Sequence, residues 1–580
     1  MKTTLLLLLA SRVVLAANYY IAQTSTGGGT GVDCANAKPY TAFNNNTLNL
    51  QPGDRVHYCG TGAFPAANGG LSFPASGVAG SVISLVFEPG AILQSDAFST
   101  AGAVSTNGKN YLLIDGQGQG VIQNTANGSN LANHKATELI NFDGSHNVEI
   151  RNFNGSGGIH NSYVNTGVNS LTSASGNGTT MTYTCSGTCQ ISAGATVTVH
   201  SNSISGYNVT DATVIGANSS TFSVAGATTG TGLGGAYSDE TSGMVAIRCV
   251  SCYVGAMNVL IHDNVIDNAQ FGILMAYEAG SSSALSIYNN KMSHMEIHIR
   301  IGDGDVNCIL TGTAIYGNEI SDWINWDDLD NNNHHVGIHL FANHIASGSG
   351  ITGSLIYNNY LHGDLGVNQT AFGIFTENVV GTSGCNGMLA FNNVLVGSNA
   401  TGHAPGNYFQ PKNSAYVCFY NNTIVAPANT GTCLETNGEL FGTGLIDWKN
   451  NICDTASTGV YETSVTDDIR AAGTDNNLYY NSPAQVFRYH SGGAAAFDTW
   501  KANCGCDGSS LTSNPNLDGT YRLQAGSPAI NAGANLTGLG ITALNTDRAG
   551  NQRPVAGAWA IGAYQFSGTL PPSSLTATVH

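Results

Sequence analysis

Ionisable side chains are concentrated in one stretch of a chain that is otherwise poor in charge. Only 9% of the 580 residues are charged, so a local cluster stands out against a neutral background. The cluster lies between positions 300 and 377 and consists of Arg300, Asp303, Asp327, Asp328, Asp330, His334, His335, His339 and Glu377. A single charged residue is usually a solvated surface position, and the paired histidines could cap a loop. The concentration nevertheless favours a functional site.

The carboxylates of this cluster match the acid–base pair of a glycoside hydrolase. An inverting glycosidase places two carboxyl groups on either side of the scissile bond, with room for a water molecule between them. Glu377 together with Asp303, Asp327 or Asp328 could provide this pair, and His339 could tune the acid. The sequence therefore predicts Glu377 as one catalytic carboxylate.

The same stretch also contains the groups that a polysaccharide lyase needs. A lyase requires a base that takes the proton next to a uronate carboxylate, and a positive charge that neutralises this carboxylate. His339 or Lys291 could be the base, and Arg300 could be the neutralising group. A calcium ion could bind the carboxylates of the acidic run 327–330, although this run lacks the glycine spacing of an EF-hand loop. We therefore expect no obligatory cofactor, with calcium as the one option.

Aromatic and polar residues around the cluster are candidates for substrate binding. Trp323 and Trp326 could stack on sugar rings, and burial beneath the loop is an equally good interpretation of both. The full set of predicted substrate-binding residues is His334, His335, Trp323, Trp326, Arg248, Tyr408, Gln410 and Lys291. No serine nucleophile elbow, phosphate-binding loop or dinucleotide fingerprint occurs in a matching context.

The candidate residues lie in short apolar segments that read as β-strands. Side chains alternate between the two faces of a strand, and stacked strands lie about 4.8 Å apart. With the isoleucines of these segments facing inward, the residues that follow them face outward on neighbouring strands: Arg248, Arg300, His339, Phe375 and Tyr408. Glu377 and Gln410 lie two residues further along and point the same way. The sequence thus predicts one outward-facing groove that contains Arg300, His339 and Glu377.

A repeated asparagine pattern predicts how these strands are stacked. Apolar or aromatic residues flank an asparagine in seven segments, with the key asparagines at 264, 290, 318, 359, 393, 422 and 450. The spacing of about 26 to 41 residues corresponds to one coil of a parallel β-helix, or to one coil with a loop insertion. Stacked asparagine side chains can then form a hydrogen-bonded ladder while isoleucine and leucine fill the interior. We predict an all-β fold, a parallel β-helix.

The pattern also divides the chain. Residues 1–17 read as a signal peptide, and 18–165 as the N-terminal cap and the first coils of the helix. Between 166 and 237 the repeat gives way to short alternating strands among Gly, Ser and Thr, which predicts an inserted small β-sandwich-like module. The coils resume over 238–566 and end in a C-terminal cap. Residues 567–580 form a polar tail.

The overall charge and the cysteine content restrict the partners and the compartment. A net charge of −18 makes nucleic acid an improbable partner, because phosphate binding needs clustered Lys and Arg. No apolar stretch is long enough to span a bilayer, so we expect a secreted, extracellular protein that is monomeric and does not associate with membranes.

Thirteen cysteines in an exported chain suggest disulfides. By proximity we expect the pairs Cys34–Cys59, Cys185–Cys189 and Cys249–Cys252, with one cysteine left over. The Cys-x-x-Cys spacing of the third pair could also indicate redox chemistry or zinc binding, but no second such motif accompanies it, which favours a local disulfide.

The asparagine repeat resembles that of the pectate-lyase-like superfamily of right-handed parallel β-helix proteins. Residues 19–23, 34–37 and 53–60 are similar to the opening of many exported members. The C-terminal region looks like the closing segment of another large set of members. The residues that carry this likeness are 526–533, 547–548, 553–554 and 561–564. The resemblance implies a right-handed helix and leaves the reaction open, because this fold hosts lyases, hydrolases, epimerases and non-catalytic adhesins.

One motif is more specific. The segment 333–339, Asn-His-His-Val-Gly-Ile-His, resembles an Asn-x-His-His-Asp-Gly-Ile-His stretch of uncharacterised exported β-helix proteins. This chain has Val336 where that pattern has Asp. If that Asp were a catalytic carboxylate, this protein would be impaired or would use another acid.

We therefore predict a polysaccharide-cleaving enzyme whose substrate lies in an extended surface groove of the β-helix. An inverting glycoside hydrolase is favoured slightly over a polysaccharide lyase. The alternative is a non-catalytic glycan-binding or surface adhesion protein, which Val336 favours and which the cluster of histidines and carboxylates disfavours.

Overall fold

The structure is a computed structural model of the whole chain. It describes residues 16–65, 68–126, 136–161, 170–189, 191, 193–239, 244–249, 254–324, 335–342, 350–364, 371–397, 406–436, 445–463, 468–481, 486–490, 492–566 and 568. The predicted signal peptide up to residue 15 and nearly all of the predicted polar tail lie outside these ranges.

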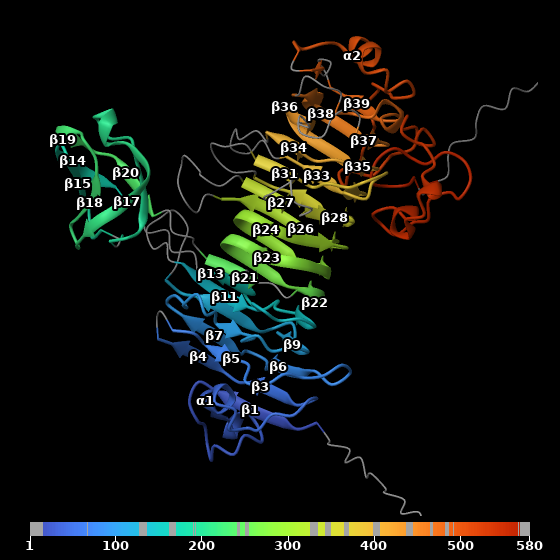
Figure 1. Cartoon of the computed structure of the whole chain (residues 1–580). Coiled ribbons are helices and arrows are strands. Elements are labelled where there is room, and N and C mark those ends of the chain that lie inside the picture. The colour runs from blue at the N-terminus through green and yellow to red at the C-terminus, as the bar shows by residue number, and fades with distance from the viewer. Residues whose placement is uncertain are drawn as a thin grey trace, which may run out of the picture.

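Three parallel sheets run along the molecule, and the chain passes through them in turn, so each circuit makes one coil of a right-handed parallel β-helix (Figure 1). The predicted fold class is confirmed by this parallel pairing. The first sheet consists of β1 (Asn18–Ala22), β3 (Arg55–Tyr58), β6 (Ile83–Phe87), β9 (Leu112–Asp115), β12 (Val148–Arg151), β22 (Gly255–His262), the end of β23 (Val265–Tyr288), β25 (Ala314–Tyr316), β29 (Ser354–Tyr357), β32 (Met388–Phe391), β35 (Val417–Tyr420) and β37 (Ile446–Lys449).

The second and third sheets complete each coil. The second consists of β4 (Thr61–Phe64), β7 (Ile92–Ser95), β10 (Val121–Asn124), β13 (Ile159–Asn161), the starts of β23 and β24 (Lys291–Thr311), β26 (Glu319–Trp323), β30 (Tyr360–His362), β33 (Val394–Val396), the starts of β36 (Thr423–Thr436) and β38 (Ile452–Glu462), and β39 (Leu478–Tyr480). The third consists of β5 (Leu71–Ser72), β8 (Val104–Ser105), β11 (Thr137–Asn141), β21 (Met244–Cys249), the middle parts of β23 and β24, β27 (His335–Phe341), β31 (Ala371–Glu377), β34 (Asn407–Lys412), the ends of β36 and β38, and β40 (Val486–Arg488).

Short elements complete the coils. They are β2 (Lys38–Pro39), which pairs with β1, β28 (Gly350–Thr352), which pairs with the end of β24, and the helices α1 (Thr41–Asn44) and α2 (Phe497–Cys504). The interior is one continuous stack of isoleucine, leucine, valine and aromatic side chains from Ile21 to Cys506. Parallel sheets that are buried along their whole length require such apolar runs, because each strand faces this core.

An asparagine ladder fixes the corner between the first and second sheets. Each ladder side chain donates to the side-chain oxygen of the next one; for example, Asn290 Nδ2 donates to Asn318 Oδ1 at 3.1 Å and to the carbonyl of Ile261 at 2.9 Å. The residue before each ladder position has a left-handed backbone, as at Asn289 (φ 54°). Asparagine and glycine tolerate this conformation better than other residues, which explains the Asn-Asn pairs in the sequence.

The ladder differs from the prediction at its last position. Asn422 Nδ2 donates to Asn451 Oδ1 at 3.0 Å, so Asn451 and not Asn450 is the ladder residue of that coil. Asn450 has φ 60° and occupies the preceding left-handed position. The ladder also continues for one more coil, through Asn477, whose amide donates to the buried Asp507 at 3.0 Å.

The segment between β13 and β21 forms a separate antiparallel body, which Figure 1 shows to the side of the helix. Its strands are β14 (Leu171–Asn177), β15 (Thr180–Cys185), β16 (Thr196–His200), β17 (Val209–Ala217), β18 (Thr221–Ala225), β19 (Thr229–Leu233) and β20 (Ala236–Asp239). They form a seven-stranded sheet and enclose a core of their own around Tyr183, Phe222 and Tyr237. This body has the character of the predicted β-sandwich-like insertion.

The C-terminal segment wraps around the last coils. Leu544 and Trp559 pack on Phe391 and Tyr420 at the outer face of the first sheet, and Leu523 and Ile561 belong to a second buried cluster around Ile452. Figure 1 shows this segment in red beside the upper coils. The end of the helix is covered by α2, whose Trp500 joins the interior core.

Two of the expected disulfides are confirmed, Cys34–Cys59 and Cys185–Cys189. Cys249 is disulfide-bonded, and its expected partner Cys252 lies outside the described residues. The sequence did not indicate the pairs Cys385–Cys418, Cys433–Cys453 and Cys504–Cys506, which the structure adds. Among the described residues, no helix is both long and apolar enough to cross a membrane.

Candidate functional site

The outer face of the third sheet carries a row of polar side chains on consecutive coils. Strand pairing places Arg300 beside His339, His339 beside Phe375, and Phe375 beside Gln410. Arg248 lies in the same row, separated from Arg300 by Leu274. The predicted common facing of Arg248, Arg300, His339 and Phe375 is therefore confirmed. We call this face the third-sheet groove.

An apolar strip runs beside this row. Val245, Phe271, Ile297, Val336 and Phe375 form a buried cluster that is separate from the helix interior. Val336 is fully buried in this strip. The residue that stands where the related motif has an aspartate thus belongs to the apolar wall of the groove.

Glu377 is the centre of the polar part of the groove. Its register partner is Phe341 on one side and Lys412 on the other, and Lys412 Nζ donates to Glu377 Oε1 at 2.6 Å. The second oxygen, Oε2, lies 3.9 Å from His339 Nε2. His339 stacks on Phe375 with ring centroids 4.7 Å apart, which fixes the orientation of its imidazole. A carboxylate, an ammonium group and an imidazole therefore converge, as chemistry at one bond requires.

Arg300 lies next to this group in an aromatic environment. Its guanidinium is 6.0 Å from the ring centre of Phe271 and 5.5 Å from that of Phe341. Desolvation lowers the pKa of Arg300, and the charge of Glu377 opposes this shift. Within the described part of the chain, Arg300 has no carboxylate at ion-pair distance. Such a guanidinium can bind an anionic group of a ligand through its planar set of donors.

The next two coils add a second carboxyl group. Gln410 Nε2 donates to Glu435 Oε1 at 2.9 Å. Glu435 follows the inward Leu434, and its register partner on the following coil is Tyr461. Burial raises the pKa of Glu435, and hydrogen bonds from Asn407 and Gln410 oppose the shift only in part. A carboxyl group with a raised pKa retains its proton to higher pH, as a general acid must.

The other end of the groove opens into a cavity of about 500 Å³. Arg248 lies in its wall and binds two carboxylates, with Nη1 2.7 Å from Glu138 Oε1 and 3.4 Å from Asp143 Oδ2. Burial raises the pKa of Glu138, while the charge of Arg248 lowers it. The cavity is also lined by Asn141, by Phe271 and by Leu274. Its volume is in the range of small-ligand sites, about 300–1,000 Å³.

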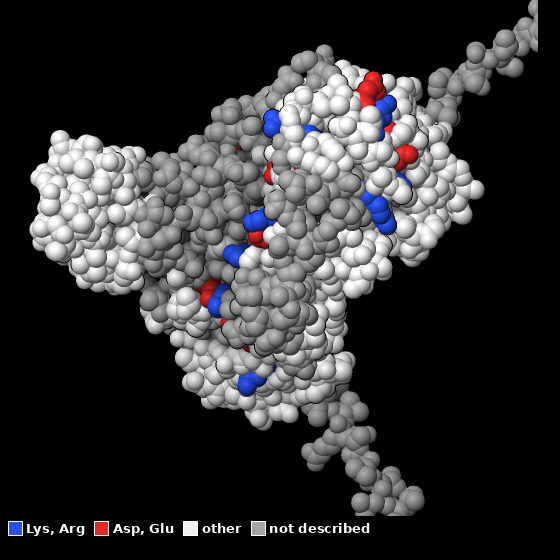
Figure 2. All heavy atoms as spheres, turned by 45° about the horizontal axis from the view of Figure 1, so that its top comes forward, with Lys and Arg blue, Asp and Glu red and all other residues white. Residues whose placement is uncertain are grey.

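The charges of this face form a line. Figure 2 shows blue and red side chains gathered along the length of the helix on a surface that is otherwise white or not described. In a protein with 9% charged residues this alignment is a distinctive surface feature.

Four predicted site residues lie elsewhere than expected. Tyr408 was expected to face outward, but it is buried in the interior core. The inward partner of Ile374 is Phe409, so Gln410 and not Tyr408 shares the row of Phe375. Trp323 is also an interior residue, 2% exposed and edge-on to His298, which excludes it as a sugar platform.

His335 and Lys291 are the other two. His335 is fully buried one residue before Val336, so it cannot line an open binding surface. Lys291 lies on the second sheet, where its ammonium is 3.3 Å from Glu319. It therefore cannot act as a base in the third-sheet groove.

Several predicted residues fall outside the described parts of the chain. These are Trp326, Asp327, Asp328 and His334, together with Asp330 of the possible calcium site. Asp303 lies in β24 beside Tyr277, and its side chain is not described.

The groove contains four charged residues that the sequence did not single out: Glu138, Asp143, Lys412 and Glu435. The alternation of side chains along a strand could have found Lys412 and Glu435, because Lys412 lies two residues after Gln410 and Glu435 directly follows an inward leucine. Glu138 and Asp143 lie in an earlier coil, and only the three-dimensional register brings them to Arg248.

Among known proteins, solved structures show a likeness to this chain, and their sequence identity is low. The sequence matches no protein-family model and no curated protein. Among solved structures, a GH136 lacto-N-biosidase from Eubacterium ramulus is similar over 86% of this chain and 67% of its own, with 10% identity and a TM-score of 0.37. An alginate lyase from a Paenibacillus species covers 77% of this chain and 97% of its own, with 11% identity and a TM-score of 0.32. Pectate lyase Pel9A covers 95% and 96%, with 12% identity and a TM-score of 0.31.

Proposed function

We propose that this protein is a secreted polysaccharide-cleaving enzyme, an inverting glycoside hydrolase whose substrate lies in the third-sheet groove. The observation that supports this most is the presence of two different carboxyl groups on the same face. Glu377 forms an ion pair with Lys412 at 2.6 Å, whereas Glu435 has no such ammonium partner among the described residues and burial raises its pKa. Glycoside hydrolysis uses two carboxyl groups in different environments, one as the acid and one as the base.

The separation of the two residues fits the inverting reaction. Glu435 lies two coils beyond Glu377. It is also two residues earlier in register, because Glu435 shares a row with Gln410, whereas Glu377 shares a row with Lys412, two residues after Gln410. With about 4.8 Å per coil and about 3.3 Å per residue, their Cα atoms are roughly 12 Å apart. Side chains that lean toward each other from this distance can bring the carboxyl groups to the ~6.5–9.5 Å of inverting enzymes.

The roles follow from the electrostatics. In the proposed reaction Glu435 donates its proton to the glycosidic oxygen as the bond to the anomeric carbon breaks. Glu377 takes a proton from a water molecule whose oxygen forms the new bond to that carbon from the opposite side. His339, stacked on Phe375 and 3.9 Å from Glu377, orients this carboxylate. The catalytic roles of Asp303, Asp327 and Asp328 stay predictions.

The environment of Arg300 indicates the kind of substrate. Arg300 is partly desolvated between two aromatic rings and has no carboxylate partner among the described residues. This environment favours an anionic group in the substrate, so we propose a polysaccharide that contains acidic sugar units. A guanidinium next to a uronate carboxylate also suits a lyase, which is the second candidate reaction.

The same groove could serve binding without catalysis. Val336 gives part of the groove an apolar wall at the position where the related motif has an aspartate, which is compatible with a glycan-binding or adhesion protein. Secretion is part of the proposal, and the disulfides support it, because such bonds persist mainly outside the cytoplasm.

Incubation of the purified protein with a panel of neutral and acidic plant and microbial polysaccharides tests the proposal. Hydrolysis should release new reducing ends without ultraviolet absorbance from unsaturated uronates. The appearance of that absorbance would replace the hydrolase by the lyase. Retention of a glycan with neither signal would replace both by the non-catalytic binder.

A further inference from the structure

A second cavity lies on a different side of the helix, between the second sheet and the C-terminal cap. Its volume is about 320 Å³, at the lower end of the range for small-ligand sites. Tyr360 of β30 contributes one wall, and the cap contributes Tyr521, Arg522, Arg548 and Tyr564. Tyr360 pairs with Glu319 and Val394 of neighbouring coils, so this cavity does not belong to the third-sheet groove.

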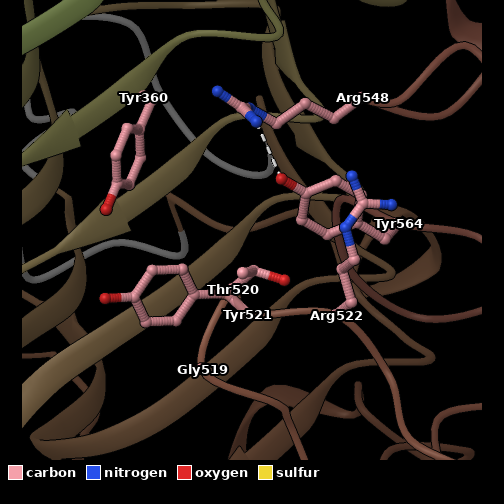
Figure 3. A pocket seen from close by; sticks show the side chains of 7 residues that line it. All are labelled: Tyr360, Gly519, Thr520, Tyr521, Arg522, Arg548 and Tyr564. Atoms are coloured by element: carbon pink, nitrogen blue, oxygen red, sulfur yellow. Dashed lines mark hydrogen bonds between the residues drawn. The ribbon is translucent and has the colours of Figure 1, made fainter.

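Two guanidinium groups are the main polar features of this cavity. Arg548 Nη1 donates to the hydroxyl of Tyr564 at 2.7 Å, and its carbon Cζ lies 5.4 Å from the ring centre of Tyr360. Arg522 lies against the other side of the site, 4.6 Å from the ring centre of Tyr564. Figure 3 shows Arg548 between Tyr360 and Tyr564, and Arg522 beside the ring of Tyr564.

The positive charge of the cavity is only partly compensated. Neither arginine has an ion pair with a carboxylate in the described part of the chain, and the Nε of Arg548 is buried without a hydrogen-bond partner. The acids around the cavity are engaged elsewhere. Asp547 accepts hydrogen bonds from Ala549 and Gln565, and Asp518 accepts one from the backbone amide of Arg522. Glu319, beside Tyr360, lies 3.3 Å from Lys291 Nζ and 3.1 Å from His362 Nε2. A buried donor without a partner is costly unless a ligand supplies an acceptor.

The tyrosines give the cavity its second property. Tyr360 and Tyr521 have ring centroids 6.3 Å apart, and the hydroxyl of Tyr564 is held by Arg548. Burial and the neighbouring Tyr521 raise the pKa of Tyr360 to about 12, so its hydroxyl remains neutral in ordinary buffers. Aromatic faces contact the C–H face of a sugar ring, and neutral hydroxyls hydrogen-bond to its alcohols.

We propose that this cavity binds a single acidic sugar unit, with its carboxylate on Arg522 and Arg548 and its ring against the tyrosines. Guanidinium groups match the planar carboxylate, and the protein otherwise carries a net charge of −18, so a carboxylate has little reason to bind outside such a site. The site would hold an acidic polysaccharide at a distance from the groove. The inference rests on the proposed function only for the class of glycan, an acidic polysaccharide.

Titration calorimetry with D-glucuronate and D-galacturonate tests this proposal, with D-glucose and sodium sulfate as comparison ligands. The protein should carry the E377Q substitution, so that groove chemistry does not contribute and the outcome is independent of catalysis. We expect at least one uronate to bind, and R522Q to weaken it about tenfold or more, because a charge-assisted hydrogen bond is lost. R548Q should weaken it as well, and higher salt should reduce the affinity.

Arg522 is exposed, and its side chain forms no hydrogen bond to any of the described residues of the cap, so R522Q should fold normally even if R548Q does not. The matched control is R55Q, which removes an exposed arginine of β3 and should leave the affinity unchanged. Absence of uronate binding, equal binding of glucose, equal binding of sulfate, or equal weakening by R55Q would each overturn the proposal.

Discussion

The asparagine ladder gives the most quantitative prediction, which concerns the replacement of Asn290 by alanine. The Asn290 side chain is buried and takes part in four hydrogen bonds. It accepts from the amide and the side chain of Asn264 at 3.2 and 3.0 Å, and donates to the Ile261 carbonyl at 2.9 Å and to Asn318 at 3.1 Å. N290A removes all four.

The cost can be estimated from the groups left behind. The amide of Asn264 and the carbonyl of Ile261 each lose a partner, and a buried polar group without a partner costs about 1–3 kcal/mol. N290A should therefore lower the free energy of unfolding by roughly 2–6 kcal/mol, a large part of the ~5–15 kcal/mol typical of a whole domain. Because coils contact only their neighbours, the loss should be concentrated near residues 261–320.

The matched control is N289G at the adjacent position. Asn289 is exposed and has φ 54°, a conformation that glycine adopts readily, so this substitution should change stability by less than about 1 kcal/mol. Urea unfolding followed by circular dichroism measures both variants, and hydrogen exchange locates the weakened coils. If N290A unfolds at the same urea concentration as N289G, the reasoning about the ladder is wrong.

Three further predictions concern a buried acid, the groove and the insertion. Burial raises the pKa of Asp454 from 3.8 to about 6, so the stability contributed by its proton is complete below about pH 4 and is lost as the pH rises through 6. In urea unfolding, D454N should therefore gain up to about 3 kcal/mol over the wild type at pH 7 and much less at pH 4, and an equal effect at both pH values would contradict this. R300M should raise KM for an acidic polysaccharide tenfold or more while the unfolding temperature falls by only a few degrees, and an unchanged KM would show that Arg300 does not contact substrate. Deletion of residues 170–239, which have their own core, should leave the β-helix folded by circular dichroism, whereas loss of its cooperative unfolding would show that the insertion is needed.

The repeat explains how much of the fold could be predicted. Ladder positions such as Asn290 and Asn359 are constrained from both sides, because the side chain must bond to the coils before and after it, and this constraint leaves a visible pattern. The shift from Asn450 to Asn451 arose where two adjacent asparagines both fit the pattern. The left-handed backbone at Asn450 and the hydrogen bond from Asn422 to Asn451 distinguish them in the structure.

The site was less predictable, because facing depends on local strand irregularities. The rule that one residue after an inward isoleucine faces outward placed Arg300 and His339 correctly. It failed at Tyr408, because both Tyr408 and the next residue, Phe409, enter the core. Glu138 lies more than 100 residues from Arg248 in sequence, so no local pattern could connect them.

The proposed cleavage in the third-sheet groove depends above all on Glu377. The most direct test is the rate at which the wild type, E377Q and E149Q release reducing ends from the polysaccharide that the wild type degrades fastest. Glu149 is a matched control, because it also binds a basic side chain and a histidine, Arg151 and His262, but lies on the first sheet. We predict that E377Q loses at least a hundredfold in kcat with an unchanged unfolding temperature, as is typical for removal of a general base, and that E149Q retains the wild-type rate. A wild-type rate for E377Q, or an equal loss in E149Q, would contradict the assignment of the active site.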